Sequence, residues 1–156
     1  MWEKLTAIVE IAAGEDAKYE LQPNGRLKLI RFIPGSRVFP GSYGEIPESL
    51  AEDGDPLDVL ILAQGRAIRP GVEVDVVPLG MLKLVDSGEK DWKLIATLAG
   101  GGAGVDVLND EKKATIWDFF EHYKDLEPSK TAIVEEWHDR AAAWDAITAA
   151  RAAYTG

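Results

Sequence analysis

Three aspartates, Asp53, Asp55 and Asp58, stand close together in the sequence, separated by Gly54 and Pro56 among others. Glycine and proline constrain this backbone, which limits how far the three carboxylates can move apart. Like charges held so close repel one another, and a bound cation would relieve that repulsion. All the candidate ligands are oxygen atoms, which favour hard cations such as Mg2+, Mn2+ or Ca2+. The stretch therefore predicts a metal site, and an acidic surface turn is the alternative.

A calcium-binding EF-hand loop starting at Asp53 is excluded by position. Such a loop needs an oxygen ligand at its fifth position, glycine at its sixth and glutamate at its twelfth. The chain has Leu57, Asp58 and Gln64 there. The aliphatic run from Val59 to Leu62 predicts a buried strand, so the acidic stretch is expected at the end of that strand, at the edge of the core.

A β-hairpin is predicted before the acidic stretch, because Pro23-Asn24-Gly25 separates two runs of strand-like residues. The expected pairs are Gln22 with Arg26, Leu21 with Leu27, Glu20 with Lys28 and Tyr19 with Leu29. A bulge at Leu29-Ile30 would then return Arg31 to the side of Lys18 and Glu20. On that pattern, the residues expected to face the core are Ile30 and Phe32.

Further strands and two helices are predicted around these elements. The expected strands are 6–12, 72–77, 81–85, 91–98 and a short one at Ile133-Val134, with turns at 69–71 and 86–90 and a flexible Gly-rich link at 100–104. The stretch 38–49 contains Pro and Gly and is expected to be irregular strand or loop. Apolar residues at Ile116, Phe119, Phe120 and Tyr123 predict a helix from Asn109 or Asp110 to about Lys124.

The Ala-rich segment 139–154 predicts a terminal helix with Trp144 and Ile147 facing inward. Many short strands followed by two helices indicate a small β-barrel with helices packed outside, in the α+β class. The sequence shows no repeat or clear boundary, so residues 1–156 are expected to form a single domain.

Composition narrows the possible partners. The net charge of −10 argues against nucleic acid and anionic membrane surfaces, and it suits a protein that binds divalent cations. There is no cysteine, which excludes disulfide and thiolate chemistry. The N-terminal residues carry charges unlike a signal peptide, and no apolar run is long enough to span a membrane. A cytoplasmic protein is expected.

Other charged and aromatic residues permit two interpretations each. Asp86 and Asp91 flank a turn and could be ligands or a solvated hairpin tip. Lys93 would share a strand face with Asp91. By spacing, Tyr123 fits a core stripe, and the neighbouring Lys124 fits a solvated cation at a helix end.

Several common catalytic and binding signals are absent or weak. His122 and His138 stand alone in helical surroundings, where a satisfied surface or core histidine is more common than a metal ligand. The Gly-rich segment 100–104 lacks the glycine spacing of a dinucleotide site and the Gly-Lys-Ser/Thr of a P-loop. No Gly-x-Ser-x-Gly elbow is present.

The stretch Asp53-Gly-Asp55-Pro-Leu-Asp58-Val resembles the signature of the soluble family I inorganic pyrophosphatases. Further matches follow in the same order along the chain, over about residues 7–150. They are Ile8-Val9-Glu10-Ile11, Lys18-Tyr19-Glu20, Arg31-Phe32, Tyr43-Gly44, Asp86 through Asp91 to Lys93, and Phe119 to Leu126. The resemblance implies a closed five-stranded barrel of OB type with two outer helices, and hydrolysis of pyrophosphate to two phosphates with several Mg2+ ions. Mn2+ or Zn2+ are possible substitutes.

The same resemblance implies roles for individual residues. The implied ligands of the tighter metals are Asp53, Asp58 and Asp91, and those of metals arriving with substrate are Asp86 and Glu20. Asp55 is implied as the base, and Glu10 as a supporting carboxylate. The groups implied to hold the two phosphoryl halves are Lys18, Arg31, Tyr43, Lys93, Tyr123 and Lys124. Hard cations and fixed basic donors are what a pyrophosphate polyanion requires.

Two positions depart from the family pattern. Phe39 stands where tyrosine is usual, so a phenol donor is lost, and Ser87 stands where an acidic residue is common. The segment between Leu98 and the helix containing Phe119 is also short. The resemblance further implies a homo-oligomer, a hexamer in many bacterial members.

Two other functions remain open from the sequence. The same metal site could serve a nucleoside di- or triphosphatase, although no aromatic pair is clearly placed to stack a base. A non-catalytic metal-binding module of OB type is the other alternative, and the basic residues argue against it, since metal storage needs no phosphate-binding Lys or Arg.

Overall fold

The structure is a computed structural model that describes residues 3–35, 37–100, 106–127 and 130–156. Its strands are β1 (Leu5–Ile11), β2 (Ala17–Leu21), β3 (Leu27–Phe32), β4 (Ser42–Ile46), β5 (Leu57–Leu62), β6 (Glu73–Asp86), β7 (Glu89–Lys90), β8 (Lys93–Leu98) and β9 (Ala132–His138). Its helices are α1 (Asp110–His122) and α2 (Arg140–Ala153). Most of the link expected at 100–104 lies outside the described residues.

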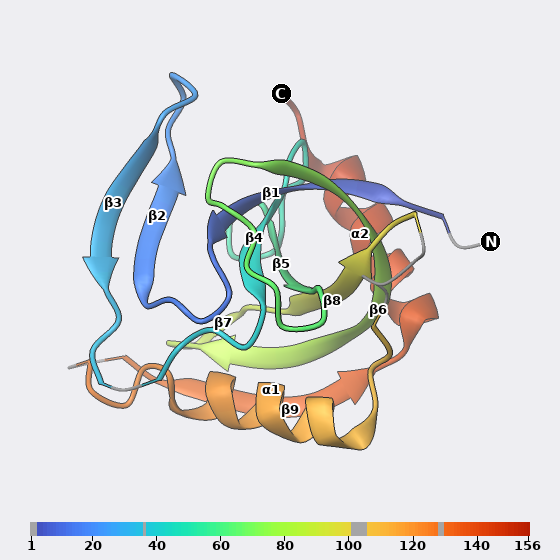
Figure 1. Ribbon diagram of the computed structural model, residues 1–156. Coiled ribbons are helices and arrows are strands. Elements are labelled where there is room, and N and C mark those ends of the chain that lie inside the picture. Colours follow the sequence, from blue (N-terminus) through green and yellow to red (C-terminus); the bar gives the residue numbers. More distant parts are fainter. Residues whose placement is uncertain (1–2, 36, 101–105, 128–129) are drawn as a thin grey trace.

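Five strands close into a ring. Their order is β1-β4-β5-β8-β6, and β6 pairs back with β1, so each of the five has two neighbours (Figure 1). The β5–β8 pair is parallel and the other pairs of the ring are antiparallel. Together with the two helices, this ring confirms the mainly-β class expected from the sequence.

The longest strand, β6, joins two segments that the sequence predicted as separate strands. Its register with β8 shifts between Pro78 and Gly80. A bulge of this kind bends a strand and increases its twist. The bend lets one strand pair with β1 and β8 in the ring and with β9 and β7 beyond it. The strand expected at Ile133-Val134 is β9, which is longer than predicted.

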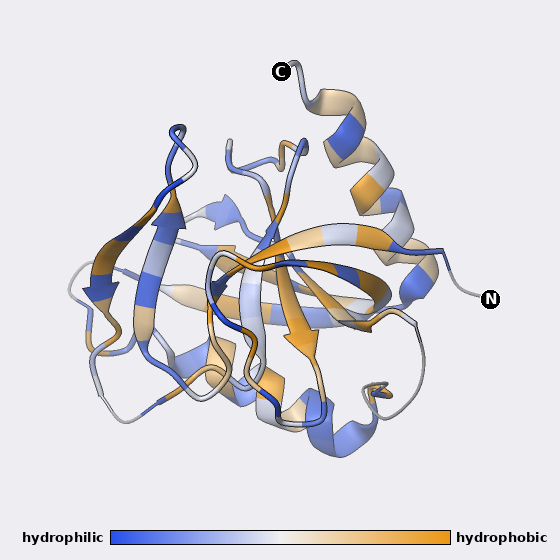
Figure 2. Ribbon diagram, turned by 45° about the horizontal axis from the view of Figure 1, so that its top comes forward, coloured by the Kyte–Doolittle hydropathy of each residue, from blue (hydrophilic) through white to orange (hydrophobic). Residues whose placement is uncertain are grey.

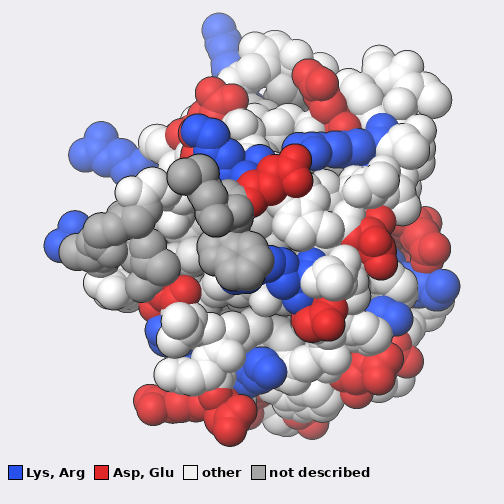
Figure 3. Space-filling model, turned by 90° about the vertical axis from the view of Figure 1, so that its right-hand side faces the viewer, with Lys and Arg blue, Asp and Glu red and all other residues white. Residues whose placement is uncertain are grey.

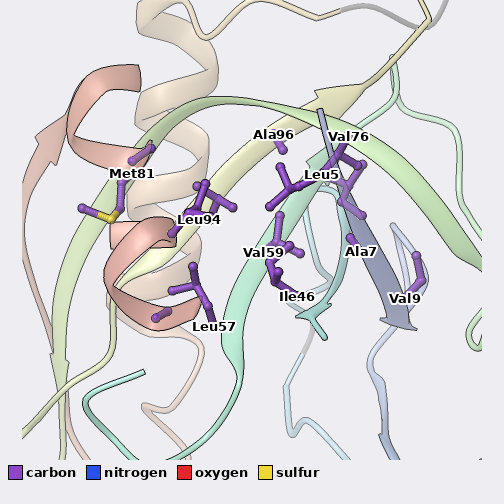
Figure 4. Packing of buried hydrophobic residues seen from close by; sticks show 14 residues of the cluster. Leu5, Ala7, Val9, Ile46, Leu57, Val59, Val76, Met81, Leu94 and Ala96 are labelled. Carbon is purple, nitrogen blue, oxygen red and sulfur yellow. The ribbon is translucent and has the colours of Figure 1, made fainter. Parts of the chain in front are cut away.

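The aliphatic run of β5 is buried on both faces. Val59 and Ile61 point into a core cluster to which all five ring strands and α2 contribute, and Figure 4 shows side chains of these strands facing this interior. Leu60 and Leu62 point the other way, into a second cluster that packs the ring against α1. A strand that is buried on both faces has a continuous apolar run in its sequence instead of an alternating pattern, and this stretch has such a run.

The hairpin of β2 and β3 stands beside the ring as a separate two-stranded sheet (Figure 1). Its predicted register is confirmed, including Tyr19 opposite Leu29 and, beyond the register shift, Lys18 opposite Arg31. The expectation that Ile30 and Phe32 face the core is wrong, because their exposed fractions are 40% and 61%. The alternation only fixes which residues share a face, and the described residues place no further strand on β3.

The stretch 38–49 contributes a regular strand, β4, to the ring, where the sequence indicated irregular structure. Its Gly44 is required by a close approach, because a Cβ there would collide with the backbone carbonyl of Ile8. The glycine is thus the reason that β1 and β4 can pair so closely, rather than a break between them.

The two predicted helices are present, and each begins with a side-chain cap. The side chain of Asn109 accepts a hydrogen bond from the backbone of Lys112 at the start of α1, and that of Asp139 accepts one from Ala142 at the start of α2. Ile147 of α2 is fully buried and Trp144 partly buried, as expected. Both helices alternate polar and apolar bands (Figure 2).

The surface opposite the hairpin interleaves basic and acidic side chains without a large patch of one sign (Figure 3). In the described ranges, no helix is both long and apolar enough to cross a membrane.

Candidate active site

A polar cleft of about 720 Å3 lies between the hairpin, the outer face of the ring and the end of α1. It brings together every site residue predicted from the sequence, although these come from positions over a hundred residues apart. They are Glu10, Lys18, Glu20, Arg31, Tyr43, Asp53, Asp55, Asp58, Asp86, Asp91, Lys93, Tyr123 and Lys124. Phe39 and Ser87, the two departures from the family pattern, also line it.

The register of the ring strands determines which side chains form the inner part of the cleft. Asp58 of β5 lies opposite Glu45 of β4 on one side and opposite Lys93 of β8 on the other. Leu57 and Val59, the neighbours of Asp58, belong to the interior cluster, so the aspartate points to the outer face of the ring. The buried strands thereby hold three charged side chains in a row.

Lys93 is the buried cation of the site. Its side chain is 3% exposed, and its ammonium donates to Asp58 Oδ2 at 2.9 Å and to Asp91 Oδ2 at 2.7 Å. A third hydrogen bond, of 2.6 Å, goes to the hydroxyl of Tyr43. Burial by itself would lower the pKa of Lys93, but Asp58 and the other acidic neighbours raise it well above its usual value.

A metal ion would find oxygen ligands beside this lysine. Asp53, Asp58 and Asp91 each offer a carboxylate oxygen, and these atoms lie within 4.8 Å of one another. The loop shape supports this grouping, because the backbone N–H of Asp55 donates to Asp53 Oδ1 at 3.0 Å and Gly54 has a φ of 88°. A purely carboxylate set, already holding an ammonium at its edge, fits a hard divalent cation.

Several carboxylates of the site have pKa values above their ordinary range. Burial, and next the charge of Glu45, raise the pKa of Glu10 to about 7. Burial also raises the pKa of Asp91 to about 6, against the opposing effect of Lys93. Burial and the nearby Asp58 raise the pKa of Glu45 as well. Crowded, partly desolvated acids of this kind are common in functional sites.

The basic residues approach from the hairpin and from the end of α1. Lys18 and Arg31 are paired across β2 and β3. Lys124 follows α1 and forms an ion pair with Asp86, and burial lowers its pKa despite that partner. The cleft therefore has a carboxylate floor and a rim of cations, which suits a substrate that is itself a polyanion held with metal ions.

The aromatic residues of the cleft pack against one another. Phe39 is 5.1 Å from Tyr43 and 4.6 Å from Phe119 between ring centroids. Tyr123 is 5.4 Å from both Phe119 and Phe120. Burial raises the pKa of both tyrosines, so their hydroxyls stay protonated and can donate hydrogen bonds.

Three charged residues that line the cleft were not predicted from the sequence: Glu45, Glu89 and Lys130. A signal existed for Glu45, which stands two residues after Tyr43 and so shares its strand face, but it required recognising β4. Lys130 carries no such signal. The two histidines lie outside the cleft, each beside a carboxylate, His122 with Asp125 and His138 with Glu136.

The ring and its cleft define a class of site: metal-assisted transfer of a phosphoryl group to water. Comparison with known proteins narrows this class. A sequence model of the inorganic pyrophosphatase family matches residues 7–155. The inorganic pyrophosphatase of Thermus thermophilus is 39% identical over an aligned length of 163. The alignment covers 99% of this chain and 92% of that protein. That of Mesorhizobium japonicum is 38% identical over 146 residues, covering 88% and 82%.

Solved structures of inorganic pyrophosphatases are also similar to this chain. The inorganic pyrophosphatase of Coxiella burnetii aligns with a TM-score of 0.91 at 35% identity, covering 98% of this chain and 96% of that one. The Thermus thermophilus structure gives the same TM-score, covering 99% and 92%. The chain belongs to the inorganic pyrophosphatase family. The expected resemblance and the OB-like ring are thereby confirmed.

Proposed function

We propose that this protein hydrolyses inorganic pyrophosphate to two orthophosphates. Family membership over nearly the whole chain supports this activity. The single structural observation that carries it is the cleft itself, which gathers carboxylates able to hold cations and basic side chains able to hold phosphates. Pyrophosphate bound with divalent cations needs both sets at once.

In this proposal Asp53, Asp58 and Asp91 hold the resident metal, and Asp86 and Glu20 hold metal that arrives with substrate. Mg2+ is the proposed ion, with Mn2+ or Zn2+ as substitutes. When bound, such ions neutralise phosphate charge and lower the pKa of water. The proposed contacts to the two phosphoryl halves are Lys18, Arg31, Tyr43, Lys93, Tyr123 and Lys124.

The proposed reaction is a direct displacement by water. The water oxygen bonds to one phosphorus while the bond from that phosphorus to the bridging oxygen breaks. The bridging oxygen keeps the electron pair and leaves with the second phosphate. Asp55, whose carboxylate is exposed to the cleft, accepts the proton that the water loses. Glu10 lines the same cleft and acts as a second, supporting carboxylate.

The protonated tyrosines and the lysines orient the substrate. Tyr43 and Tyr123 can donate hydrogen bonds to phosphate oxygens, because burial keeps both hydroxyls protonated. Lys93 and Lys124 supply fixed positive charge where negative charge develops on the leaving phosphate. Phosphoryl transfer depends mainly on such positioning and charge neutralisation.

The proposal extends to the whole chain as one domain that forms a homo-oligomer, a hexamer, in the cytoplasm. The family's bacterial pattern, as implied by the resemblance, motivates the hexamer. Size-exclusion chromatography with light scattering tests the assembly directly, and a monomeric mass would contradict it.

Release of phosphate from pyrophosphate, with Mg2+ and with a chelator, tests the proposed activity. We expect release with Mg2+ and none with the chelator. ATP in place of pyrophosphate tests the nucleotidase alternative, which the cleft disfavours because its aromatic rings pack on one another rather than standing free to stack a base. Metal binding without any phosphate release would instead support the non-catalytic alternative.

A further inference from the structure

Glu127 is a buried carboxylate behind the basic rim of the cleft. It follows α1 in the segment that carries Lys124, and its backbone N–H donates to the carbonyl of Lys124 at 3.0 Å. Its side chain is 8% exposed. The glutamate does not itself line the cleft, but the cations beside it do.

Two of those cations surround its carboxylate. Nη1 of Arg31 forms an ion pair with Oε1 of Glu127, and Nζ of Lys130 lies 3.7 Å from Oε2. Within the described residues, neither oxygen accepts a hydrogen bond of regular geometry. A buried carboxylate is costly unless charges compensate it, so Glu127 and Arg31 depend on each other.

The ion pair joins two parts of the fold. Arg31 belongs to β3, which pairs only with β2 among the described strands, whereas Glu127 belongs to the segment after α1. The guanidinium has five N–H donors in a planar fork. One edge can rest on Glu127 while another faces the cleft, where the 29% exposure of the Arg31 side chain leaves it open. A lysine, with its donors at one point, could not serve both sides equally well.

We propose that Glu127 is a positioning residue for Arg31, and through it for the hairpin wall of the cleft. This inference rests on the proposed function, since it specifies how a predicted phosphate-binding arginine is held ready. Glu127 fixes the guanidinium before substrate arrives, so that binding does not have to order a long side chain and a separate hairpin at the same time.

Glu127→Gln tests this directly, because it keeps the shape and removes the charge. We expect KM for pyrophosphate to rise about tenfold with a smaller change in kcat. In an Arg31→Gln background the same substitution should change KM no further, because its route of action is gone. Glu127→Asp, which keeps the charge on a shorter side chain, should fall between wild type and Glu127→Gln, and it replaces that variant if Glu127→Gln does not fold.

Asp118→Asn is the matched control. It removes the 2.7 Å ion pair of Asp118 with Arg37, which also ties the chain after the hairpin to α1 but lies outside the cleft. We expect it to leave KM unchanged. An unchanged KM in Glu127→Gln, or an equal rise in the Arg31→Gln background, would overturn the inference.

Hydrogen exchange separates this inference from the proposed activity. In Glu127→Gln, amides of β2 and β3 should exchange faster than in wild type, while those of β5 stay protected. If wild type released no phosphate from pyrophosphate, the proposed function would fail, yet faster hairpin exchange would still support the anchor. Unchanged hairpin exchange would reject the anchor whatever the activity.

Discussion

The ammonium of Lys93 lies 2.6 Å from the hydroxyl oxygen of Tyr43. The same ammonium donates to Asp58 and Asp91, so each of its three N–H donors has an acceptor. One cation thus neutralises the inner edge of the proposed metal site and fixes a phenol that lines the cleft. The stability of the metal-free protein should therefore depend on this lysine.

Lys93→Met keeps much of the side-chain length but leaves the carboxylates of Asp58 and Asp91 without their cation. We expect the free energy of unfolding, measured by urea denaturation with a chelator, to fall by about 3–5 kcal/mol. Lys90→Met is the control, because its 3.3 Å pair with Glu52 is exposed and should be worth under about 1 kcal/mol. Equal losses in the two variants would show that Lys93 is not a structural counter-ion.

Asp58→Asn tests the proposed metal site without measuring activity. A divalent ion that binds only the native state adds about 2.7 kcal/mol at a hundred times its Kd, which should raise the melting temperature by about 5 °C. We expect Asp58→Asn to lose most of this gain. Asp125→Asn, outside the cleft and beside His122, should keep it. Thermal melts with excess Mg2+ and with chelator measure both, and an identical shift in Asp58→Asn would rule out this metal site.

Asp55→Asn tests the proposed base. The amide keeps the size of the side chain and an oxygen atom but no longer accepts a proton. We expect kcat to fall by about 100-fold or more, the usual scale for a general base. The melting temperature should not fall, because the exposed loop loses a repelling charge. Near-normal turnover in a steady-state assay would assign the base role to another residue.

Phe39→Tyr restores the phenol that the chain lacks at this position. The Phe39 ring is 3% exposed and packs on Tyr43 and Phe119, while also lining the cleft. If the ring serves packing alone, turnover should change little, and this is the outcome we expect. A tenfold gain would correspond to about 1.4 kcal/mol of transition-state stabilisation and would show that the missing hydroxyl limits this enzyme.

The sequence was sufficient where the local pattern and the tertiary structure agree. The run Val59 to Leu62 became the two-sided central strand, and the register of the hairpin followed from its turn and bulge. It also identified the side chains that meet in the cleft, because their spacing matched a family motif. Gly54 supplies the positive φ that the acidic loop requires.

The sequence was not sufficient to predict structural features that depend on contacts between segments far apart in the chain. The apolar face of β3, with Ile30 and Phe32, has the alternation of a buried strand, but only the tertiary structure determines that no further layer covers it in the described residues. Gly44 resembled a break and is instead the point at which β1 passes closest. Glu127 had no local signal at all, because its importance arises only from its contact with Arg31.

Glu10 lines the cleft and is also hydrogen-bonded to the hairpin. One of its carboxylate oxygens accepts a 3.2 Å hydrogen bond from the backbone N–H of Leu21, the last residue of β2. Burial, with the nearby Glu45 charge, raises its pKa from the ordinary 4.5 to about 7. Its protonation should therefore alter the stability of the metal-free fold.

The direction in which the free energy of unfolding changes with pH follows from the raised pKa of Glu10. Between pH 4.5 and about 7 the folded protein keeps a proton that the unfolded chain releases, so stability is full below this window and falls as pH rises through it. The slope is at most about 1.4 kcal/mol per pH unit for this one group. Asp91, with a pKa of about 6, adds in the same direction. In urea unfolding with chelator, Glu10→Gln should flatten this slope, and the exposed Glu73→Gln should keep it. A Glu10→Gln protein with the wild-type slope would mean that Glu10 stays ionised across the window.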